Sequence, residues 1–262
     1  MRGVILAGGA GSRLDPLSKY TSKQLLPIYD KPLIYYPLTT LILAGVSEVL
    51  LITTPKFKSV FQDLLGDGSQ WGITIEFIAQ EKPEGIPQGL ILAEDFLKNE
   101  SFAFILGDNL FYGTGLGRTL QAYGENSGAQ IFAREVSDPE RFGVVEQDNS
   151  GKVLSIEEKP SVPKSNFAIT GLYFFDNKAV SIAKTLTKGP RGEYEMVDLL
   201  RRYLENNELQ VKILPRGTAW LDTGTFESLN DASNFVRIIQ ENQGFKIGDP
   251  GEASKFMGRN VR

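Results

Sequence analysis

A glycine-rich turn with one arginine follows the first apolar segment of the chain. Gly3–Ala7 runs into Gly8-Gly9-Ala10-Gly11-Ser12-Arg13. Glycines let backbone N–H groups approach phosphate oxygens, and a guanidinium beside them can pair with the same oxygens. The two familiar phosphate loops do not fit, because the Gly-Lys-Ser/Thr ending of one is missing and Leu14 replaces the third glycine of the other. The turn predicts a triphosphate site, with a plain turn at a sheet edge as the alternative.

A second cation lies close in sequence to this turn. Lys23 opens the segment Lys23-Gln24-Leu25-Leu26-Pro27, ten residues after Arg13. A lysine at the start of an apolar segment is usually a solvated surface charge. A ligand with several phosphates requires more than one cation, so the two residues together favour a phosphate site.

Two aspartates follow apolar segments far apart in the sequence. Asp108 comes after Phe102–Leu106, and Asp222 comes after Trp220 and Leu221. Carboxylates at the carboxyl ends of strands often hold metal ions in α/β enzymes, and two of them could share one Mg²⁺ with substrate phosphates. Either aspartate could instead cap the next element. Both interpretations stay open at this point.

Further polar groups follow predicted strands. Gln80 and Gly85 offer an amide and a glycine suited to the edge of a nucleobase, although an ordinary loop has the same residues. Lys159 lies beside Glu158 at the end of a predicted hairpin, where a surface ion-pair cluster is the simpler interpretation. The segments around Tyr173 and Arg191 are weak signals on their own.

The composition removes several other chemistries. The 262 residues include no histidine and no cysteine. Ser-His-Asp and Cys-His nucleophile pairs, disulfides and the usual zinc sites are therefore excluded. Phosphoryl-group chemistry remains possible, because it depends on positioning and on charge neutralisation by cations and a hard metal ion.

The charge pattern bears on partners and compartment. Lys and Arg number 28 against 32 Asp and Glu, and they are scattered along the chain. We therefore expect no nucleic-acid partner. No apolar run approaches the roughly 20 residues that span a bilayer, and Met1–Leu6 lacks a signal-peptide pattern. We expect a cytoplasmic protein with no membrane partner.

Short apolar runs alternate with amphipathic stretches in the first half. The runs predict strands at Gly3–Ala7, Val49–Thr53, Ile73–Ile78, Phe102–Leu106 and Gln130–Ala133. The stretches predict helices at Leu33–Ala44, Lys56–Leu65, Gln88–Leu97 and Leu116–Asn126. This alternation predicts βαβ units and an α/β fold with a mainly parallel sheet. Ligands of such sheets bind at the carboxyl ends of the strands, where the glycine turn and Asp108 lie.

The second half is richer in strands. They are predicted at Phe142–Gln147, Val153–Glu157, Phe167–Phe175, Val211–Leu214 and Thr218–Leu221. Helices are predicted at Lys178–Leu186, Glu195–Asn206 and Thr225–Gln243, the last ending before Gly244. We expect a single domain over residues 1–262, made of a nucleotide-binding βα half over 1–137 and a second part over 138–262.

Six ordered motifs closely resemble those of the sugar-nucleotidyltransferase family. They are Leu6-Ala-Gly-Gly-Ala-Gly-Ser-Arg13, Ser22-Lys-Gln-Leu-Leu-Pro27, Leu106-Gly-Asp-Asn109, Glu157-Glu-Lys-Pro160, Ile169-Thr-Gly-Leu-Tyr173 and Trp220-Leu-Asp-Thr-Gly-Thr225. Tyr29–Pro37, Leu65–Ser69 and Asp138–Val145 resemble its glucose-1-phosphate thymidylyltransferase subgroup. The likeness extends from Met1 to about Gly248. It implies a Rossmann-like, GT-A-like mixed sheet flanked by helices, with a β-rich part over 138–262 that binds the sugar phosphate.

The resemblance implies an enzyme that makes dTDP-glucose and pyrophosphate from dTTP and glucose 1-phosphate. A phosphate oxygen of the sugar phosphate would attack the α-phosphorus in line, with no covalent enzyme intermediate. Carried over by motif, the catalytic residues are Arg13, Lys23, Asp108 and Asp222, and the two aspartates hold Mg²⁺. The nucleotide-binding positions are Leu6, Gly8, Gly9, Gly11, Ser12, Arg13, Gln24, Gln80, Gly85 and Asp108. The sugar-phosphate positions are Asn109, Gly143, Glu158, Lys159, Ile169, Tyr173 and Arg191.

The sequence departs from the subgroup in a few places. Phe226 stands where relatives often have histidine, and Pro87 replaces a small residue. Many thymidylyltransferases continue with helices that help to form a secondary nucleotide site, whereas this sequence ends at Arg262, so feedback regulation through that site is not predicted. The family suggests a homo-oligomer, a tetramer or a dimer. Its interface could use four aromatic residues that could equally be core: Tyr35, Tyr36, Phe111 and Tyr112.

Three other functions use similar residues. Uridylyl or cytidylyl transfer to a related sugar 1-phosphate would use the same groups. A non-catalytic nucleotide-sugar-binding homologue would have lost the cations or the carboxylates, and this sequence retains them. A glycosyltransferase usually carries an Asp-X-Asp metal motif, but the strand end here is Gly107-Asp108-Asn109.

Overall fold

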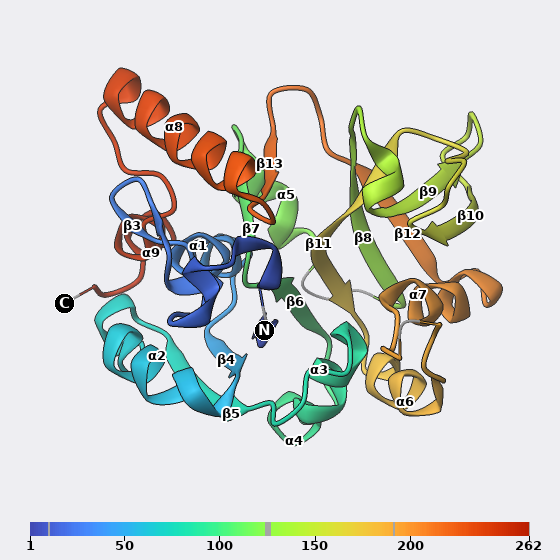
Figure 1. Ribbon diagram of the computed structural model, residues 1–262, viewed down its shortest axis with the longest axis horizontal. Coiled ribbons are helices and arrows are strands. Elements are labelled where there is room, and N and C mark those ends of the chain that lie inside the picture. Colours follow the sequence, from blue (N-terminus) through green and yellow to red (C-terminus); the bar gives the residue numbers. More distant parts are fainter. Residues whose placement is uncertain (10, 124–126, 191, 262) are drawn as a thin grey trace. The chain divides into compact units, whose positions relative to one another are not determined.

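The computed structural model describes residues 1–9, 11–123, 127–190 and 192–261, and its chain forms two compact units (Figure 1). Unit 1 comprises Met1–Pro83, Ile105–Ala122 and Gly217–Arg262. Unit 2 comprises Glu84–Phe104 and Tyr123–Arg216. Residues from both ends of the sequence therefore build unit 1, which holds the glycine turn, Lys23 and both aspartates.

Unit 1 contains three parallel strands. β1 (Arg2–Ala7) pairs with β4 (Glu48–Thr53), which pairs with β5 (Thr74–Ala79). β1 and β4 are almost continuously apolar and buried, as strands covered on both faces are. Their common direction brings Ala7, Thr53 and Ala79 to one edge, so the residues that follow these strands emerge together.

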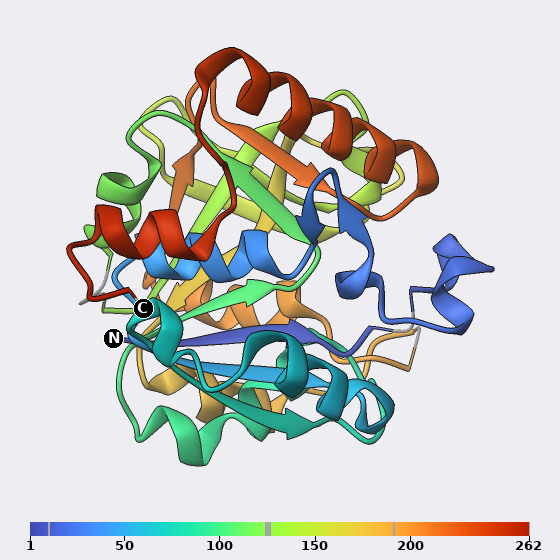
Figure 2. The same cartoon turned by 90° about the vertical axis from the view of Figure 1, so that its left-hand side faces the viewer.

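Helices and short strands complete unit 1. They are β2 (Pro27–Ile28), β3 (Lys31–Pro32), α1 (Tyr35–Leu43), α2 (Lys58–Leu65), β7 (Asn109–Tyr112), α5 (Leu116–Gln121), β13 (Ala219–Asp222), α8 (Phe226–Gln243) and α9 (Pro250–Phe256). β7 and β13 form an antiparallel ribbon, and α1 lies beside α9 (Figures 1 and 2). One core cluster joins β2, α1, β7, α8 and the segment after α8: Ile28, Leu33, Tyr36, Leu110, Ala232, Val236 and Ile247.

A buried lysine ties the β2–β3 turn to the C-terminal helix region. Lys31 is 7% exposed and pairs with Asp30. Its Nζ also donates to Gln240 Oε1 at 3.2 Å and to the carbonyl of Ile247 at 3.1 Å. Buried charges require such partners, so this cluster fixes α8 and the segment after it on unit 1.

Unit 2 is built on a mixed arrangement of strands. β8 (Ala129–Glu135) pairs antiparallel with β11 (Phe167–Phe175) and parallel with β12 (Leu209–Ile213). β9 (Gly143–Gln147) pairs antiparallel with β10 (Val153–Glu158) and with β11. Its helices are α3 (Ile86–Leu92), α4 (Glu94–Leu97), α6 (Lys178–Thr185) and α7 (Met196–Glu205), and β6 (Phe102–Leu106) carries the chain into unit 1.

The expected α/β class, with a mixed and mainly parallel sheet flanked by helices, is confirmed. The helix predicted over Gln88–Leu97 is instead two helices, α3 and α4, separated at Ala93. Pro87 lies in the first turn of α3, where its missing N–H costs no hydrogen bond. The helix predicted over Leu116–Asn126 ends at Gln121, and its residues 124–126 lie outside the described part.

Three short strands and one α-helix of the described part were not predicted. The strands are β2, β3 and β7, which directly follows Asp108, and the helix is α9, which lies after Gly244. The start of α9 has a recognisable signal, because Pro250 occupies its first turn and Asp249 accepts a hydrogen bond from the N–H of Glu252 at 3.0 Å.

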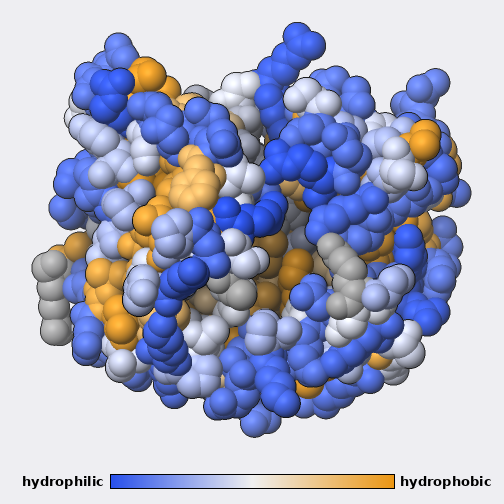
Figure 3. All heavy atoms as spheres, in the orientation of Figure 1, coloured by the Kyte–Doolittle hydropathy of each residue, from blue (hydrophilic) through white to orange (hydrophobic). Residues whose placement is uncertain are grey.

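On the face drawn in Figure 3, hydrophilic residues cover most of the surface and hydrophobic residues form smaller patches. The most exposed large apolar side chains are Tyr20, Val162 and Phe256. Within the described ranges, no helix combines the length and apolarity needed to cross a membrane. Of the four aromatic residues considered for an interface, Tyr36 and Phe111 are buried core residues of unit 1.

Candidate active site

The glycine turn lies beside the residue that follows β5. Gln80 is 3% exposed, and its N–H donates to the carbonyl of Thr53 at 2.7 Å. A Cβ added to Gly8 would lie 2.1 Å from Gln80 Oε1. Only glycine at this position allows the amide to rest against the turn, so the fold brings together two residues predicted to bind the nucleotide.

The rest of the turn forms a short 3₁₀ helix over Ser12–Leu14, preceded by Gly11 at φ 62°. A Cβ added to Gly9 would meet no atom within 4 Å, so the turn is open there. Ala10 lies outside the described residues. The exposed Arg13 extends towards the loop after β13, because a Cβ added to Gly224 would lie 3.2 Å from Arg13 Nη2.

The buried Lys23 forms an ion pair with Asp108, whose side chain is 30% exposed. Lys23 is 5% exposed, so it is not a solvated surface charge, and its Nζ lies 2.7 Å from Asp108 Oδ2. Burial acts to raise the pKa of Asp108. The charge and hydrogen bond of Lys23, with a hydrogen bond from Asn109, outweigh it and hold this pKa below its ordinary value. The carboxylate is therefore ionised and paired before any ligand arrives.

The other oxygen of Asp108 is held by an amide. Asn109 Nδ2 donates to Asp108 Oδ1 at 2.9 Å, and Asn109 is 3% exposed. Asn109 Oδ1 in turn accepts from Trp220 Nε1 at 2.6 Å. Asn109 was predicted among the sugar-phosphate residues, and the structure places its side chain between Asp108 and Trp220.

Neither aspartate caps a helix. Asp108 is followed by strand β7, and α8 is capped by Thr225, whose side chain accepts from the N–H of Ser228 at 3.2 Å. Asp222 Oδ1 instead accepts from the N–H of Gly224 at 2.7 Å.

The two aspartates are linked through their neighbours. Asp222 lies opposite Asn109 in the β7–β13 ribbon. The hydroxyl of Thr223, which is fully buried, donates to the carbonyl of Asp108 at 3.0 Å. In the described ranges no three acidic side chains come together as a metal cluster, so a cation at these two would need oxygens from its ligand or from water.

Three residues of this region were not among the predicted site residues: Gly107, Thr223 and Trp220. Gly107 donates its N–H to the carbonyl of Leu6 at 2.8 Å, and an added Cβ would lie 3.1 Å from Gln24 Cγ. Gln24, which was predicted to bind the nucleotide, is 4% exposed, and its Oε1 accepts from the hydroxyl of Ser22 at 2.6 Å. Thr223 and Trp220 stand inside a recognised motif, yet their contacts depend on strand register.

In unit 2, Gly85 makes a close backbone contact. Its φ is 108°, and a Cβ there would lie 2.2 Å from the carbonyl oxygen of Tyr194. The N–H of Tyr194 donates to the carbonyl of Glu84 at 2.8 Å, and Glu84 pairs with Lys188. The glycine predicted to contact the base is thus held against the segment that follows Arg191, which itself lies outside the described residues.

The predicted sugar-phosphate residues of unit 2 partly converge. Glu158 lies opposite Gly143 in the β9–β10 pair, and a Cβ added to Gly143 would lie 3.5 Å from Ile169 Cδ1 and 3.6 Å from Glu158 Oε2. Lys159 follows at φ 44°, and its side chain is 46% exposed with Nζ 3.6 Å from Glu158 Oε1. Tyr173 is 4% exposed and stacks on Phe175 in the core.

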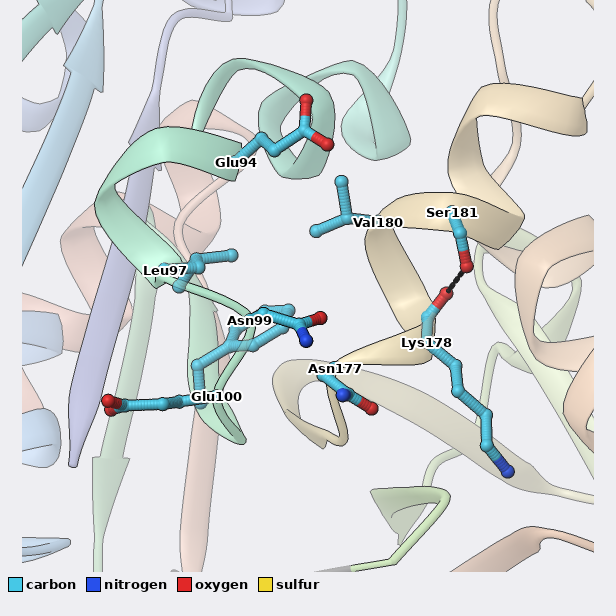
Figure 4. A pocket seen from close by; sticks show the side chains of 9 residues that line it. Glu94, Leu97, Asn99, Glu100, Asn177, Lys178, Val180 and Ser181 are labelled. Atoms are coloured by element: carbon cyan, nitrogen blue, oxygen red, sulfur yellow. Dashed lines mark hydrogen bonds between the residues drawn. The ribbon is translucent and has the colours of Figure 1, made fainter.

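Two hollows are lined by none of the residues predicted to bind substrate or metal. One of about 380 Å³ lies in unit 2 between α4 and α6 (Figure 4). The other, of about 600 Å³, lies in unit 1 beside α5, α9 and the segment between α8 and α9.

Comparison with known proteins identifies the family of this chain. The model of the nucleotidyl transferase family matches residues 2–238. A glucose-1-phosphate thymidylyltransferase of Mycolicibacterium smegmatis is 54% identical over 98% of this chain and 90% of that protein. One of Neisseria gonorrhoeae is 54% identical over 94% of this chain and 86% of that protein.

Solved structures share the fold. A provisionally named glucose-1-phosphate thymidylyltransferase of Bacillus anthracis, crystallised with sucrose, has a TM-score of 0.83 and 38% identity and covers 90% of this chain and 95% of its own. A structure of a UDP-glucose pyrophosphorylase complexed with UDP-glucose has a TM-score of 0.79 and covers 90% of this chain and 98% of its own. Its sequence is 23% identical, so this likeness shows the fold alone. The resemblance inferred from the six motifs is confirmed, and the chain belongs to the nucleotidyl transferase family.

Proposed function

We propose that the protein transfers a thymidylyl group from dTTP to glucose 1-phosphate, giving dTDP-glucose and pyrophosphate. The names of relatives that are 54% identical over nearly the whole chain support this substrate pair and do not favour another base. The observation that carries the proposal is the ion pair of the buried Lys23 with Asp108, at 2.7 Å, in the same unit as the open glycine turn. A cation held in advance near a phosphate loop is what stabilisation of phosphoryl transfer requires.

The residues of unit 1 fit the nucleotide. The backbone of the glycine turn and Arg13 would bind the triphosphate, and Lys23 would neutralise charge at the α-phosphate and the leaving pyrophosphate. The carboxamide of Gln80 can donate to a base carbonyl and accept from a base N–H, which suits the pairing edge of thymine. Uracil has the same edge, so discrimination between dTTP and UTP has to rest on the methyl group of thymine or on the 2′-hydroxyl of the ribose in UTP.

The reaction needs no general base. The attacking oxygen belongs to a sugar phosphate, which is an anion at neutral pH. It can form its bond to the α-phosphorus while the bond to pyrophosphate breaks, and no proton has to move. A chain without histidine can therefore perform this transfer through positioning and electrostatic stabilisation.

Asp108 and Asp222 would hold the Mg²⁺ ion. Their carboxylate oxygens are the hard donors that this ion prefers. Asp108 Oδ2 accepts from Lys23 and Oδ1 accepts from Asn109, and a carboxylate oxygen has two lone pairs. When bound, the ion supplies neutralisation of phosphate charge. Phosphate and water oxygens would complete its shell.

Residues of unit 2 would hold the sugar phosphate. Lys159 offers an exposed ammonium for the phosphate, and Gly143, Glu158 and Ile169 lie close enough together to contact the sugar. Tyr173, Arg191 and, in unit 1, Asn109 complete the proposed set. The division at residue 138, the homo-oligomeric state and the cytoplasmic location stay predictions.

Pyrophosphate release tests this function. The protein is assayed with Mg²⁺ and every pairing of dTTP, UTP and CTP with glucose 1-phosphate and related sugar 1-phosphates. The highest kcat/KM is expected for dTTP with glucose 1-phosphate, and Asp108→Asn and Lys23→Ala are expected to abolish most of it. Lys212→Ala, at an exposed lysine of β12, is the matched control. Wild-type rates in both site variants would overturn the assignment.

A further inference from the structure

One face of the β7–β13 ribbon carries polar side chains that contact each other. The register pairs Asp222 with Asn109, Leu221 with Leu110 and Trp220 with Phe111. Side chains alternate along a strand, so Trp220, Asp222, Asn109 and Phe111 share one face while the two leucines pack into the core. Trp220 and Asn109 are diagonal neighbours there, a spacing that aromatic side chains can bridge.

The chemistry of its two partners fixes the orientation of the Asn109 amide. The indole of Trp220 can only donate, and the ionised carboxylate of Asp108 can only accept. Asn109 Oδ1 therefore faces Trp220 at 2.6 Å, and Nδ2 faces Asp108 at 2.9 Å. A flipped amide would place two donors against each other at one end and two acceptors at the other.

We propose that Trp220 is a positioning residue, which fixes the carboxylate of Asp108 through Asn109. Because Asn109 is only 3% exposed, water cannot readily replace a lost donor, so loss of the indole N–H would hold the amide less firmly against Asp108. With Oδ1 committed to the amide, Oδ2 is the oxygen that faces Lys23. The Trp220–Asn109 pair thus holds Asp108 in one orientation towards an incoming cation.

The proposal rests on the proposed function only in assuming that Asp108 binds a divalent cation together with dTTP. Groups that orient a metal ligand typically contribute roughly 10- to 100-fold to metal affinity. Trp220→Phe keeps an aromatic ring on the ribbon and removes the donor. It should therefore lower the affinity for a divalent cation, while the affinity for metal-free nucleotide stays close to that of the wild type.

The test measures dTTP binding by calorimetry with Mn²⁺ and with EDTA, without sugar phosphate. In the wild type Mn²⁺ is expected to strengthen dTTP binding, and in Trp220→Phe that gain should fall roughly 10- to 100-fold. Trp71→Phe, at the only other tryptophan, is the matched control and should leave the gain unchanged. An unchanged gain from Mn²⁺ in Trp220→Phe would overturn the proposal. An equal loss of dTTP affinity with Mn²⁺ and with EDTA would also overturn it, because such a loss indicates a merely structural role.

A double-mutant cycle tests the route through Asn109. In an Asn109→Ala background, Trp220→Phe should have no further effect on the gain from Mn²⁺, because the amide that it acts through is absent. Additive losses would contradict the relay. A fluorescence measurement keeps Trp220 in place. In Trp71→Phe the indole of Trp220 is the single one left, and its fluorescence emission should change when Mn²⁺ and dTTP are added. Constant emission would count against the proposal.

Failure of the proposed function gives a different pattern. If dTTP does not bind, Mn²⁺ alone is titrated by electron paramagnetic resonance, and the relay requires weaker binding in Trp220→Phe than in the wild type. If the wild type binds no Mn²⁺ in either experiment, the relay is wrong. If turnover of dTTP is observed and the gain from Mn²⁺ is insensitive to Trp220, the function stands and the relay fails.

Discussion

The two lysines proposed to bind phosphate lie in opposite environments. In unit 1, Lys23 is 5% exposed and holds Asp108 at 2.7 Å. In unit 2, the side chain of Lys159 is 46% exposed and lies 3.6 Å from Glu158. The first cation is fixed before a ligand arrives, whereas the second is placed by its backbone and is otherwise solvated. Fixed charge favours stabilisation of a transition state, and a solvated charge is suited to initial binding.

Two glycines show a related difference. The nearest atom to an added Cβ is the end of the Gln80 side chain at Gly8 and the backbone of Tyr194 at Gly85. A side chain can move aside, but a backbone carbonyl in a bridge cannot. Substitution in unit 1 should therefore disturb binding, and substitution in unit 2 should disturb the fold.

The largest expected effect separates the two lysines. Lys23→Met should lower kcat by about 10³-fold, since donors that stabilise developing charge contribute 10²–10³ or more. It should also cost about 2 kcal/mol of unfolding free energy, because Asp108 loses its charged partner. Rates of pyrophosphate release and urea unfolding measure the two effects.

Lys159→Met is the matched counterpart. It should raise KM for glucose 1-phosphate about tenfold and change the unfolding free energy by less than about 0.5 kcal/mol, because exposed ion pairs contribute little. The contrast between the lysines fails if both variants are equally destabilised, or if Lys159→Met lowers kcat as much as Lys23→Met does.

The next effect concerns Gly85. Gly85→Ala should destabilise the protein by about 3 kcal/mol, because φ is 108° and the new Cβ would lie 2.2 Å from a backbone oxygen. Urea unfolding measures it. Gly151→Ala shares a positive φ of 85° but meets no atom within 4 Å, so about 1 kcal/mol is expected there. Equal losses in the two variants would show that the Tyr194 contact contributes nothing.

The smallest effect uses a third lysine, which is buried but outside the proposed site. Burial acts to raise the pKa of Asp30, and its bonds from Lys31 and Gln240 outweigh burial and lower this pKa. A lowered pKa gives stability that is present above the ordinary value near 4 and is lost as pH falls through the lowered pKa. Asp30→Asn should therefore be less stable than the wild type at pH 7, with the difference shrinking in acid and turnover unaffected.

Thermal unfolding midpoints between pH 7 and 3 check this prediction. A difference between wild type and Asp30→Asn that grows in acid would have the wrong sign. Loss of turnover in Asp30→Asn would contradict the distinction between the two buried lysines. It would mean that Lys31, like Lys23, supports the reaction and not only the fold.

Part of the site could be predicted because buried parallel strands are continuous apolar runs, which are easily recognised in a sequence. The apolar run of β1 and the run before Asp108 identify strand ends, and the sheet rule then places Gly8 and Asp108 where ligands bind. The contact of Trp220 with Asn109 could not be predicted, because it joins residues 111 positions apart through a register that only the folded ribbon defines.

The cap interpretation of Asp222 had a signal against it that was not used. Thr225 followed three residues later by Ser228 forms the capping box of α8, a variant of the usual Ser/Thr-x-x-Glu pattern. The environment of Lys23 gave no such signal, because burial of a lysine depends on a carboxylate 85 positions away.

The central claim is that this protein joins the α-phosphate of dTTP to a sugar phosphate. The most direct test incubates it with Mg²⁺, glucose 1-phosphate and dTTP labelled at the α-phosphate, and follows the label by chromatography. The label is expected in dTDP-glucose, with none in pyrophosphate, and Lys23→Met should slow its appearance about 10³-fold. Label that stays in dTTP, or that is released as dTMP without entering dTDP-glucose, would contradict the account.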